Sequence, residues 1–164
     1  MRFNRVVVLV TSAFVVVGLA GAGLLAGAVA EQKMEAAAPK AEKSLYERLG
    51  KYDAIAAVVD DFIGRLLADP QFMRFFSGAS ADSKGRIRQL IVDQLCSLTG
   101  GPCVYLGRDM KKAHAGLGIT EADWDASVKH LTAALDKFKV PEKEKSEVLT
   151  AVSAFKKDIV EKAQ

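Results

Sequence analysis

Apolar residues recur at steps of three and four positions along most of the chain beyond residue 50, which is the spacing of one face of an α-helix. This pattern predicts five helices: residues 53–68, residues 82–99, a short helix that carries His114, a helix from Thr120 with Phe138 on its inner face, and a helix opened by Pro141 whose inner face reaches Val160. Asp53 and Thr120 are the expected N-caps of the first and fourth, because their side chains accept bonds from free helix N–H groups. No segment alternates apolar and polar residues over enough positions to predict a strand. The sequence therefore predicts an all-α domain.

The chain begins with a long apolar run. Residues 6–30 are almost entirely apolar, and Arg2 and Arg5 precede them. As a helix this run would extend roughly 37 Å, more than the ~30 Å hydrocarbon core of a bilayer. Two interpretations stay open: a secretory signal with the cleavage site Ala28-Val29-Ala30, or an uncleaved membrane anchor whose start remains in the cytoplasm. Both predict a domain outside the cytoplasm, either exported to a periplasmic or other extracytoplasmic space or anchored to a membrane.

The rest of the sequence divides into a linker and one domain. Residues 31–44 are charged and rich in alanine, contain Pro39 and show no apolar periodicity, which is typical of a linker. We therefore expect a signal peptide or transmembrane anchor over residues 1–30, a linker over 31–44 and a single folded domain over 45–163.

The charge of the chain is nearly balanced. It has 23 basic and 20 acidic residues, for a net charge of +3, and without Arg2 and Arg5 the remaining 21 basic residues face 20 acidic ones. Because the two signs are interspersed, we expect no nucleic-acid partner. We expect contact with a membrane only through residues 6–30.

His114 is the residue with the clearest candidate chemistry. The chain has two histidines, and this one ends a segment rich in glycine and charge, residues 100–114, between two amphipathic stretches. A solitary histidine at a helix end is most often a capping or solvated residue. A solitary histidine that faces a cavity between packed helices can also bind a haem iron from one side. His130, in the fourth predicted helix, we interpret as structural.

Several short motifs follow one another in a specific order from residue 44 to residue 160. They are Leu45-Tyr46 with Leu49-Gly50, Asp61-Phe62, Phe75-Phe76-Ser77-Gly78, Gly100-Gly101-Pro102, Tyr105 with Gly107, Met110-Lys111 with His114, and Gly116 with Gly118-Ile119-Thr120. A single pair such as Gly-Gly is a weak signal, but the ordered set resembles the truncated haemoglobins, and specifically their first group.

The resemblance implies a truncated globin fold, which is a two-over-two helical sandwich around one haem b. It implies that His114 is the axial iron ligand and that diatomic gases (oxygen, nitric oxide and carbon monoxide) bind at the open side of the iron. The other cofactor-binding residues that it implies are Phe76 against the porphyrin, Tyr105 near a propionate, and Ile87, Ile91, Met110, Ile119 and Trp124.

The expected distal pocket departs from the family pattern at the first long helix. Group-one members usually carry a tyrosine directly after the Asp-Phe pair, where it hydrogen-bonds the bound oxygen. In this chain the position is Ile63. A hydrogen bond to a partly negative ligand is worth about 1–3 kcal/mol, so its loss implies weaker retention of oxygen by roughly ten- to a hundredfold.

The facing helix departs from the pattern as well. Family members often carry a glutamine there, and counting back from Gly100 places Ile91 at that position and Ile87 one turn earlier. A one-residue slip would substitute Leu90 and Arg86, and neither register supplies a glutamine. Gln94, like Gln89, is close enough to compete for the distal pocket. The resemblance therefore implies a distal side that is largely apolar.

Cys96 and Cys103 are the only cysteines in the chain. In an exported protein an even number of cysteines indicates a disulfide, which would join the second predicted helix to the segment that leads to His114. A redox-responsive pair of thiols is the alternative. Two thiols without a nearby third ligand make a poor zinc site.

The resemblance favours reversible gas binding, and two other functions stay open. One is nitric oxide dioxygenation, which needs an electron donor; the chain has no nicotinamide or flavin motif, so a separate redox partner would supply the electrons. The other is a haem-free helical adaptor that binds another protein. No nucleophile–base arrangement is visible, and we expect any catalysis to belong to the iron.

Overall fold

The structure, a computed structural model, describes residues 42–162. Contacts divide the chain into two units, residues 1–39 and residues 40–164, and the described residues belong to the second unit. The predicted signal or anchor and most of the predicted linker lie outside the described residues. Within residues 42–162, no helix combines the length and the apolar character that crossing a bilayer requires.

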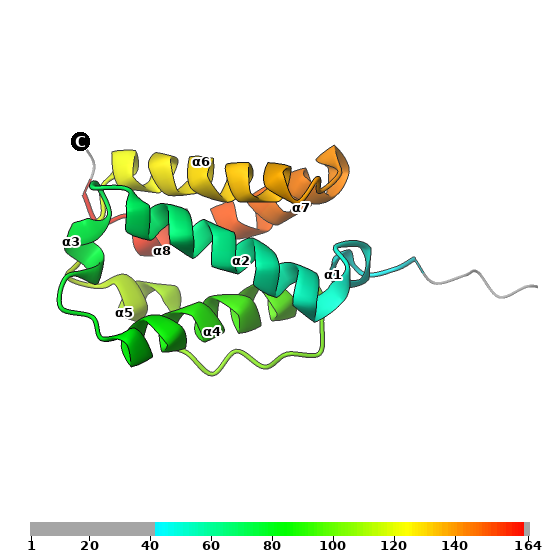
Figure 1. The fold of residues 1–164 in the computed structure, drawn as a ribbon, viewed down its shortest axis with the longest axis horizontal. Helices are drawn as coiled ribbons and strands as arrows, with labels where there is room; N and C mark the ends of the chain where they lie inside the picture. The colour runs from blue at the N-terminus through cyan, green and yellow to red at the C-terminus, as the bar shows by residue number, and fades with distance from the viewer. Residues whose placement is uncertain (1–41, 163–164) are drawn as a thin grey trace, which may run out of the picture. The chain divides into compact units, whose positions relative to one another are not determined.

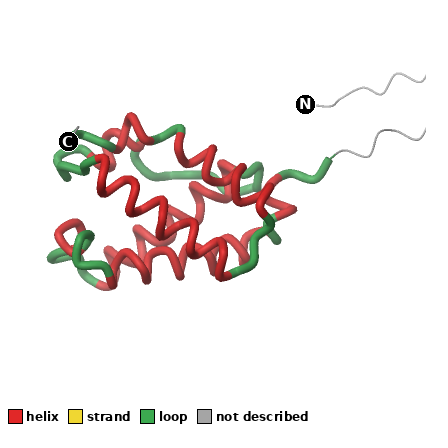
Figure 2. The backbone as a smooth tube through the Cα atoms, turned by 90° about the horizontal axis from the view of Figure 1, so that it is seen from above, coloured by secondary structure: helices red, strands yellow, loops and turns green. Residues whose placement is uncertain are grey.

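The described residues form helices joined by loops (Figures 1 and 2). The eight helices among them are α1 (Leu45–Arg48), α2 (Lys51–Ala68), α3 (Met73–Phe76), α4 (Ala81–Leu98), α5 (Met110–His114), α6 (Glu121–Lys137), α7 (Glu142–Ser153) and α8 (Lys156–Ile159). Within residues 42–162, the one pairing of extended backbone is a single bridge between Thr120 and Lys162. The prediction of an all-α domain is confirmed.

Helix ends differ from the predictions where the caps differ. α2 begins at Lys51 because the chain enters it through Gly50 in a left-handed conformation, so Asp53 lies inside the first turn and the prediction that it is the N-cap was wrong. α4 begins and ends one residue earlier than predicted, since the Ser80 hydroxyl accepts a bond from the backbone of Ser83 and acts as the cap. Thr120 caps α6 as predicted.

The C-terminal part of the domain also differs from the predictions. Phe138 is 43% exposed, because α6 ends at Lys137 and the left-handed Lys139 turns the chain away. The predicted last helix is two helices, since the helical run stops at Ser153 and resumes at Lys156 as α8. This break directs the chain after α8 back toward the loop that follows α5.

The core lies on both sides of α2, which packs against α4 and against α6 (Figure 1). α2 supplies four buried residues to the first cluster and Val58 to the second, so one helix contributes to both. The cluster with α4 consists of Ile55, Ala56, Val59, Ile63, Val92, Leu95 and Cys96. The cluster with α6 and α7 consists of Val58, Leu131, Ala134, Leu135 and Val148. An apolar pocket of about 150 Å³ adjoins the second cluster, and His114 is not among its lining residues.

Candidate haem site

His114 is the last residue of α5, a helix that Asp109 caps by accepting a bond from the backbone of Lys112. Its side chain is half-buried, and its Nδ1 lies 2.8 Å from the carbonyl oxygen of Met110. Because a carbonyl can only accept, Nδ1 is the donor in this contact, and in the corresponding neutral tautomer the lone pair is on Nε2. A neutral imidazole oriented by a backbone carbonyl is the form in which histidine ligates a metal.

The surroundings of His114 decide which metal group fits. Among residues 42–162, no three histidine, cysteine, aspartate or glutamate side chains lie together in a way that could hold a metal ion. A metal on His114 would therefore need its other ligands from outside the polypeptide, and a porphyrin supplies four nitrogens. One imidazole as the single protein ligand is compatible with haem.

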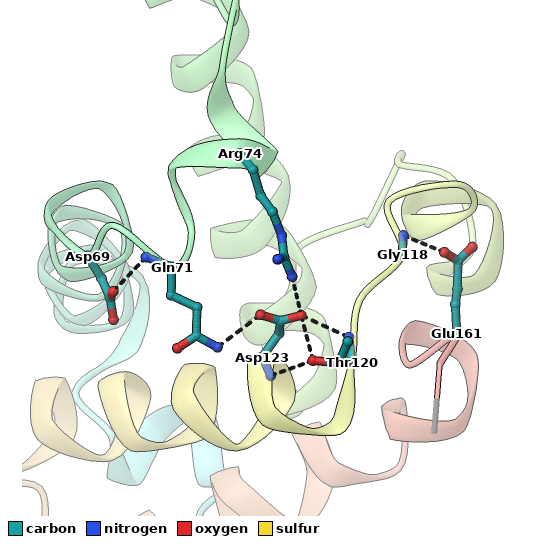
Figure 3. Close-up of polar contacts among 7 residues, drawn as sticks. All are labelled: Asp69, Gln71, Arg74, Gly118, Thr120, Asp123 and Glu161. Atoms are coloured by element: carbon teal, nitrogen blue, oxygen red, sulfur yellow. Dashed lines mark hydrogen bonds and ion pairs between the residues drawn. The ribbon is translucent and has the colours of Figure 1, made fainter. Parts of the chain in front are cut away.

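The loop after His114 is held from the C-terminal end of the domain. One carboxylate oxygen of Glu161 accepts a bond from the backbone N–H of Gly116 at 2.5 Å, and the other accepts from Gly118 at 2.6 Å (Figure 3 shows the second). These two backbone bonds hold the pKa of the Glu161 carboxyl below its usual value. The carboxylate therefore stays ionised at neutral pH.

Asp123 connects the same loop to the segment before α4 (Figure 3). Only 3% of Asp123 is exposed, and its carboxylate accepts bonds from the backbone and hydroxyl of Thr120, at 2.9 and 2.8 Å. It also accepts from Gln71 at 2.9 Å and pairs with Arg74 of α3 at 2.5 Å. Burial opposes ionisation, but the bonds from Gln71 and Thr120 and the charge of Arg74 outweigh it and hold the pKa of Asp123 below its usual value.

The predicted distal residues lie on α2 and α4. Ile63 is 8% exposed and belongs to the cluster between these helices, and Ile91 packs against that cluster. Ile87, Ile91 and Gln94 follow a four-residue and a three-residue step, so they share one face of α4. None of these three isoleucine side chains can donate a hydrogen bond. This wall is apolar except for one amide.

That amide belongs to Gln94. Its Oε1 is buried and has no hydrogen-bond partner among residues 42–162. Gln89, the other glutamine near the predicted pocket, donates from Nε2 to the Tyr52 hydroxyl at 2.8 Å and to Asp93 at 2.9 Å. Gln89 is thus engaged toward the start of α2, and Gln94 is the amide of α4 with an unused acceptor.

The remaining predicted cofactor residues lie at the end of α3, in and before α5, and around the start of α6. Ile119 and Trp124 are buried, whereas Phe76, at the end of α3, is half-buried. The Tyr105 hydroxyl donates to the carbonyl oxygen of Arg108 at 2.7 Å. Partial burial, followed by the charge of Asp109, raises the pKa of Tyr105, so its hydroxyl remains a neutral donor.

The predicted disulfide is present. Cys96, which is fully buried in α4, is bonded to Cys103, and their Cα atoms are 5.7 Å apart. The bond joins α4 to the segment that leads into α5. The disulfide thus ties the helix with the predicted distal residues to the segment that ends at His114, the residue predicted to bind the iron.

The sequence did not indicate the polar bonds around the loop after His114. The Thr120–Asp123 spacing was detected as a capping box, but its further partners Gln71 and Arg74 are about fifty residues away in the chain. Glu161 is part of a short charged end and follows no motif.

The chain is similar to globins over nearly the whole described region. A family model described as bacterial-like globin matches residues 44–161. The group 1 truncated haemoglobin of Mycolicibacterium paratuberculosis is 36% identical over 116 residues, which cover 71% of this chain and 83% of that protein.

Solved structures show the same likeness. The crystal structure of truncated haemoglobin from Tetrahymena pyriformis in the Fe(III) form has a TM-score of 0.67 and 29% identity, covering 73% of this chain and 100% of that chain. The 2/2 haemoglobin from Synechococcus, in the cyanomet state with covalently attached haem, has a TM-score of 0.66 and 30% identity, covering 72% of this chain and 98% of that chain.

Proposed function

Because the chain belongs to the bacterial-like globin family and, within it, to the group 1 truncated haemoglobins, we propose that it binds diatomic gases reversibly at a haem b iron held by His114. Haem b as the cofactor and gas binding as the activity are common to this family. The identity of the ligand residue, the gases it prefers and its location are the proposal.

The observation that carries the proposal is the bond between Nδ1 of His114 and the carbonyl oxygen of Met110. It fixes the tautomer and leaves Nε2 as the atom that can donate a lone pair. His114 would hold the haem, whose iron would supply the binding site for a small gas. Met110, Ile119 and Trp124 are the residues that we expect to exclude water around the imidazole, together with Phe76 on the opposite side.

The preference among gases follows from the wall formed by α2 and α4. With Ile63 and Ile91 there, a partly negative ligand such as oxygen gains no hydrogen bond from these two positions. We therefore expect weak retention of oxygen relative to carbon monoxide, with nitric oxide as a further ligand.

We also propose that the domain lies outside the cytoplasm, exported or anchored to a membrane. The apolar run of residues 6–30 preceded by two arginines supports this, as does the disulfide between Cys96 and Cys103, since such bonds persist in oxidising compartments. Free-thiol counting on protein taken directly from its native compartment tests it. Two free thiols there would contradict this location.

The test of ligation is the absorption spectrum of the purified full-length protein, ferric and ferrous, with and without carbon monoxide. His114→Ala should remove the axial ligand and abolish the Soret band of the wild type. His130→Ala is the matched control, because His130 pairs with Asp69 at 2.8 Å and packs against Phe72, and its spectrum should be unchanged. A protein that stays colourless with added haemin, or a spectrum that depends on His130, would overturn the proposal.

A further inference from the structure

We infer that Glu161 is a positioning residue that fixes the backbone directly after His114 and thereby orients the imidazole toward the haem iron. This inference rests on the proposed ligation of iron by His114.

The short length of α5 is the first reason that His114 needs such support. The helix has five residues, and His114 is its last, so the chain leaves the helix immediately after the predicted ligand. Within the loop, the backbone N–H of Leu117 donates to the His114 carbonyl at 3.2 Å. The bond from Nδ1 to Met110 holds the ring to the helix, but on the side of the loop this turn-type bond is weak support for the backbone of His114.

The conformation of the loop is the second reason. Gly116 and Gly118 have φ angles of +82° and +63°, a left-handed conformation that residues other than glycine rarely adopt. Glycine allows this path but does not enforce it, since a glycine backbone has many alternatives. The two carboxylate oxygens of Glu161, each on one of these N–H groups, select one path among them.

Glu161 is itself held in place. Its backbone N–H donates to the carbonyl oxygen of Ile119 at 2.9 Å, and that of Lys162 donates to the same oxygen at 3.2 Å. α8, which directly precedes this tail, packs against α5. The side chain of Glu161 thus binds Gly116 and Gly118 while its backbone binds Ile119, so both ends of residues 116–119 are attached to the same residue.

The chemistry of the contact requires a carboxylate. Two N–H groups point at the side chain, and a carboxylate offers an acceptor oxygen to each. A glutamine offers one acceptor, and its NH₂ group would face the other N–H without forming a bond. Glu161→Gln therefore removes half of the contact with almost no change in shape, and Glu161→Ala removes all of it.

The test is the iron–histidine stretching band of the ferrous full-length protein, measured by resonance Raman spectroscopy. We expect a single narrow band in the wild type, a broadened and shifted band in Glu161→Ala, and an intermediate band in Glu161→Gln. Transfer of haem to an excess of apomyoglobin should be about tenfold faster for Glu161→Ala, because two charge-assisted hydrogen bonds are lost. Glu142→Ala is the matched control, since its exposed carboxylate pairs with Lys145 in α7, and it should match the wild type.

The outcomes separate this inference from the proposed function. If the five-coordinate ferrous wild type shows no iron–histidine band, or keeps it in His114→Ala, the proposed ligation is wrong. If the wild-type band depends on His114 but is equally narrow in both Glu161 variants, ligation stands and the role of Glu161 is refuted. Should Glu161→Ala bind no haem, Glu161→Gln alone decides, and a wild-type band in that variant refutes the role.

Discussion

The two sides of the candidate site are built from different interactions. The loop after His114 is held by two carboxylates, that of Glu161 from the distant C-terminal segment and that of Asp123 from the first turn of α6, through bonds to backbone and side-chain donors. The facing wall of α2 and α4 is held by apolar contacts that include Ile63 and Ile91.

The difference follows from what each side has to do. A coordinate bond is directional, so the ligand needs a defined angle, and hydrogen bonds supply angles. A chamber for a small gas needs shape and the exclusion of water, which non-directional apolar packing supplies. The disulfide belongs to the apolar side, because Cys96 lies in the apolar cluster and Cys103, in the segment that leads to His114, packs against it.

The largest expected effect on stability comes from removing the buried carboxylate of Asp123 on the polar side of the site. Asp123→Ala removes the acceptor of Thr120, Gln71 and Arg74, and should lower the free energy of unfolding by about 3 kcal/mol. Urea unfolding followed by circular dichroism measures it. Asp125→Ala, in the same first turns of α6 but exposed, should change stability by less than about 0.5 kcal/mol. Equal effects of the two variants would show that the buried carboxylate has no special role.

A smaller effect is expected from adding a polar group to the apolar side. Ile63→Tyr places a hydroxyl donor in the α2–α4 wall, and oxygen dissociation measured by stopped flow should slow by about tenfold or more. Ile63→Phe adds similar bulk without a hydroxyl and serves as the control. An oxygen off-rate in the wild type already as slow as that of Ile63→Tyr would mean that another donor is present, and the buried amide of Gln94 would then be the first residue to replace.

The smallest expected effect is the change in the free energy of unfolding with pH, which is absent near neutral pH and develops in acid. The pKa values of Asp123 and Glu161 are both lowered in the folded chain, so the unfolded chain binds protons more readily. Their contribution to stability is complete above the ordinary carboxyl range and is lost as the pH falls below about 4. Urea midpoints at pH 7, 4 and 3 should therefore decrease more steeply for the wild type than for Asp123→Asn. Parallel decreases would contradict the assignment of this acid sensitivity to Asp123.

Local features of the site could be predicted because they depend on neighbouring residues. The short helix that carries His114, the cap formed by Thr120 and the pairing of Cys96 with Cys103 each involve residues within eight positions of one another. α2 begins two residues before its predicted start, because the left-handed backbone of Gly50, which no side chain signals, and not the side chain of Asp53 leads the chain into the helix. The break between α7 and α8 was missed because apolar spacing continues across it.

The order of motifs and the apolar spacing alone determined the family, the all-α class and the candidate ligand, since each is written in short stretches of the chain. Only the tertiary structure decided how that ligand is held. Glu161 lies 45 positions from Gly116, and Asp123 lies 49 positions from Arg74, so no local pattern pairs them. Such contacts depend on how packed helices bring distant segments together, and the packing of α8 against α5 brings Glu161 close to Gly116.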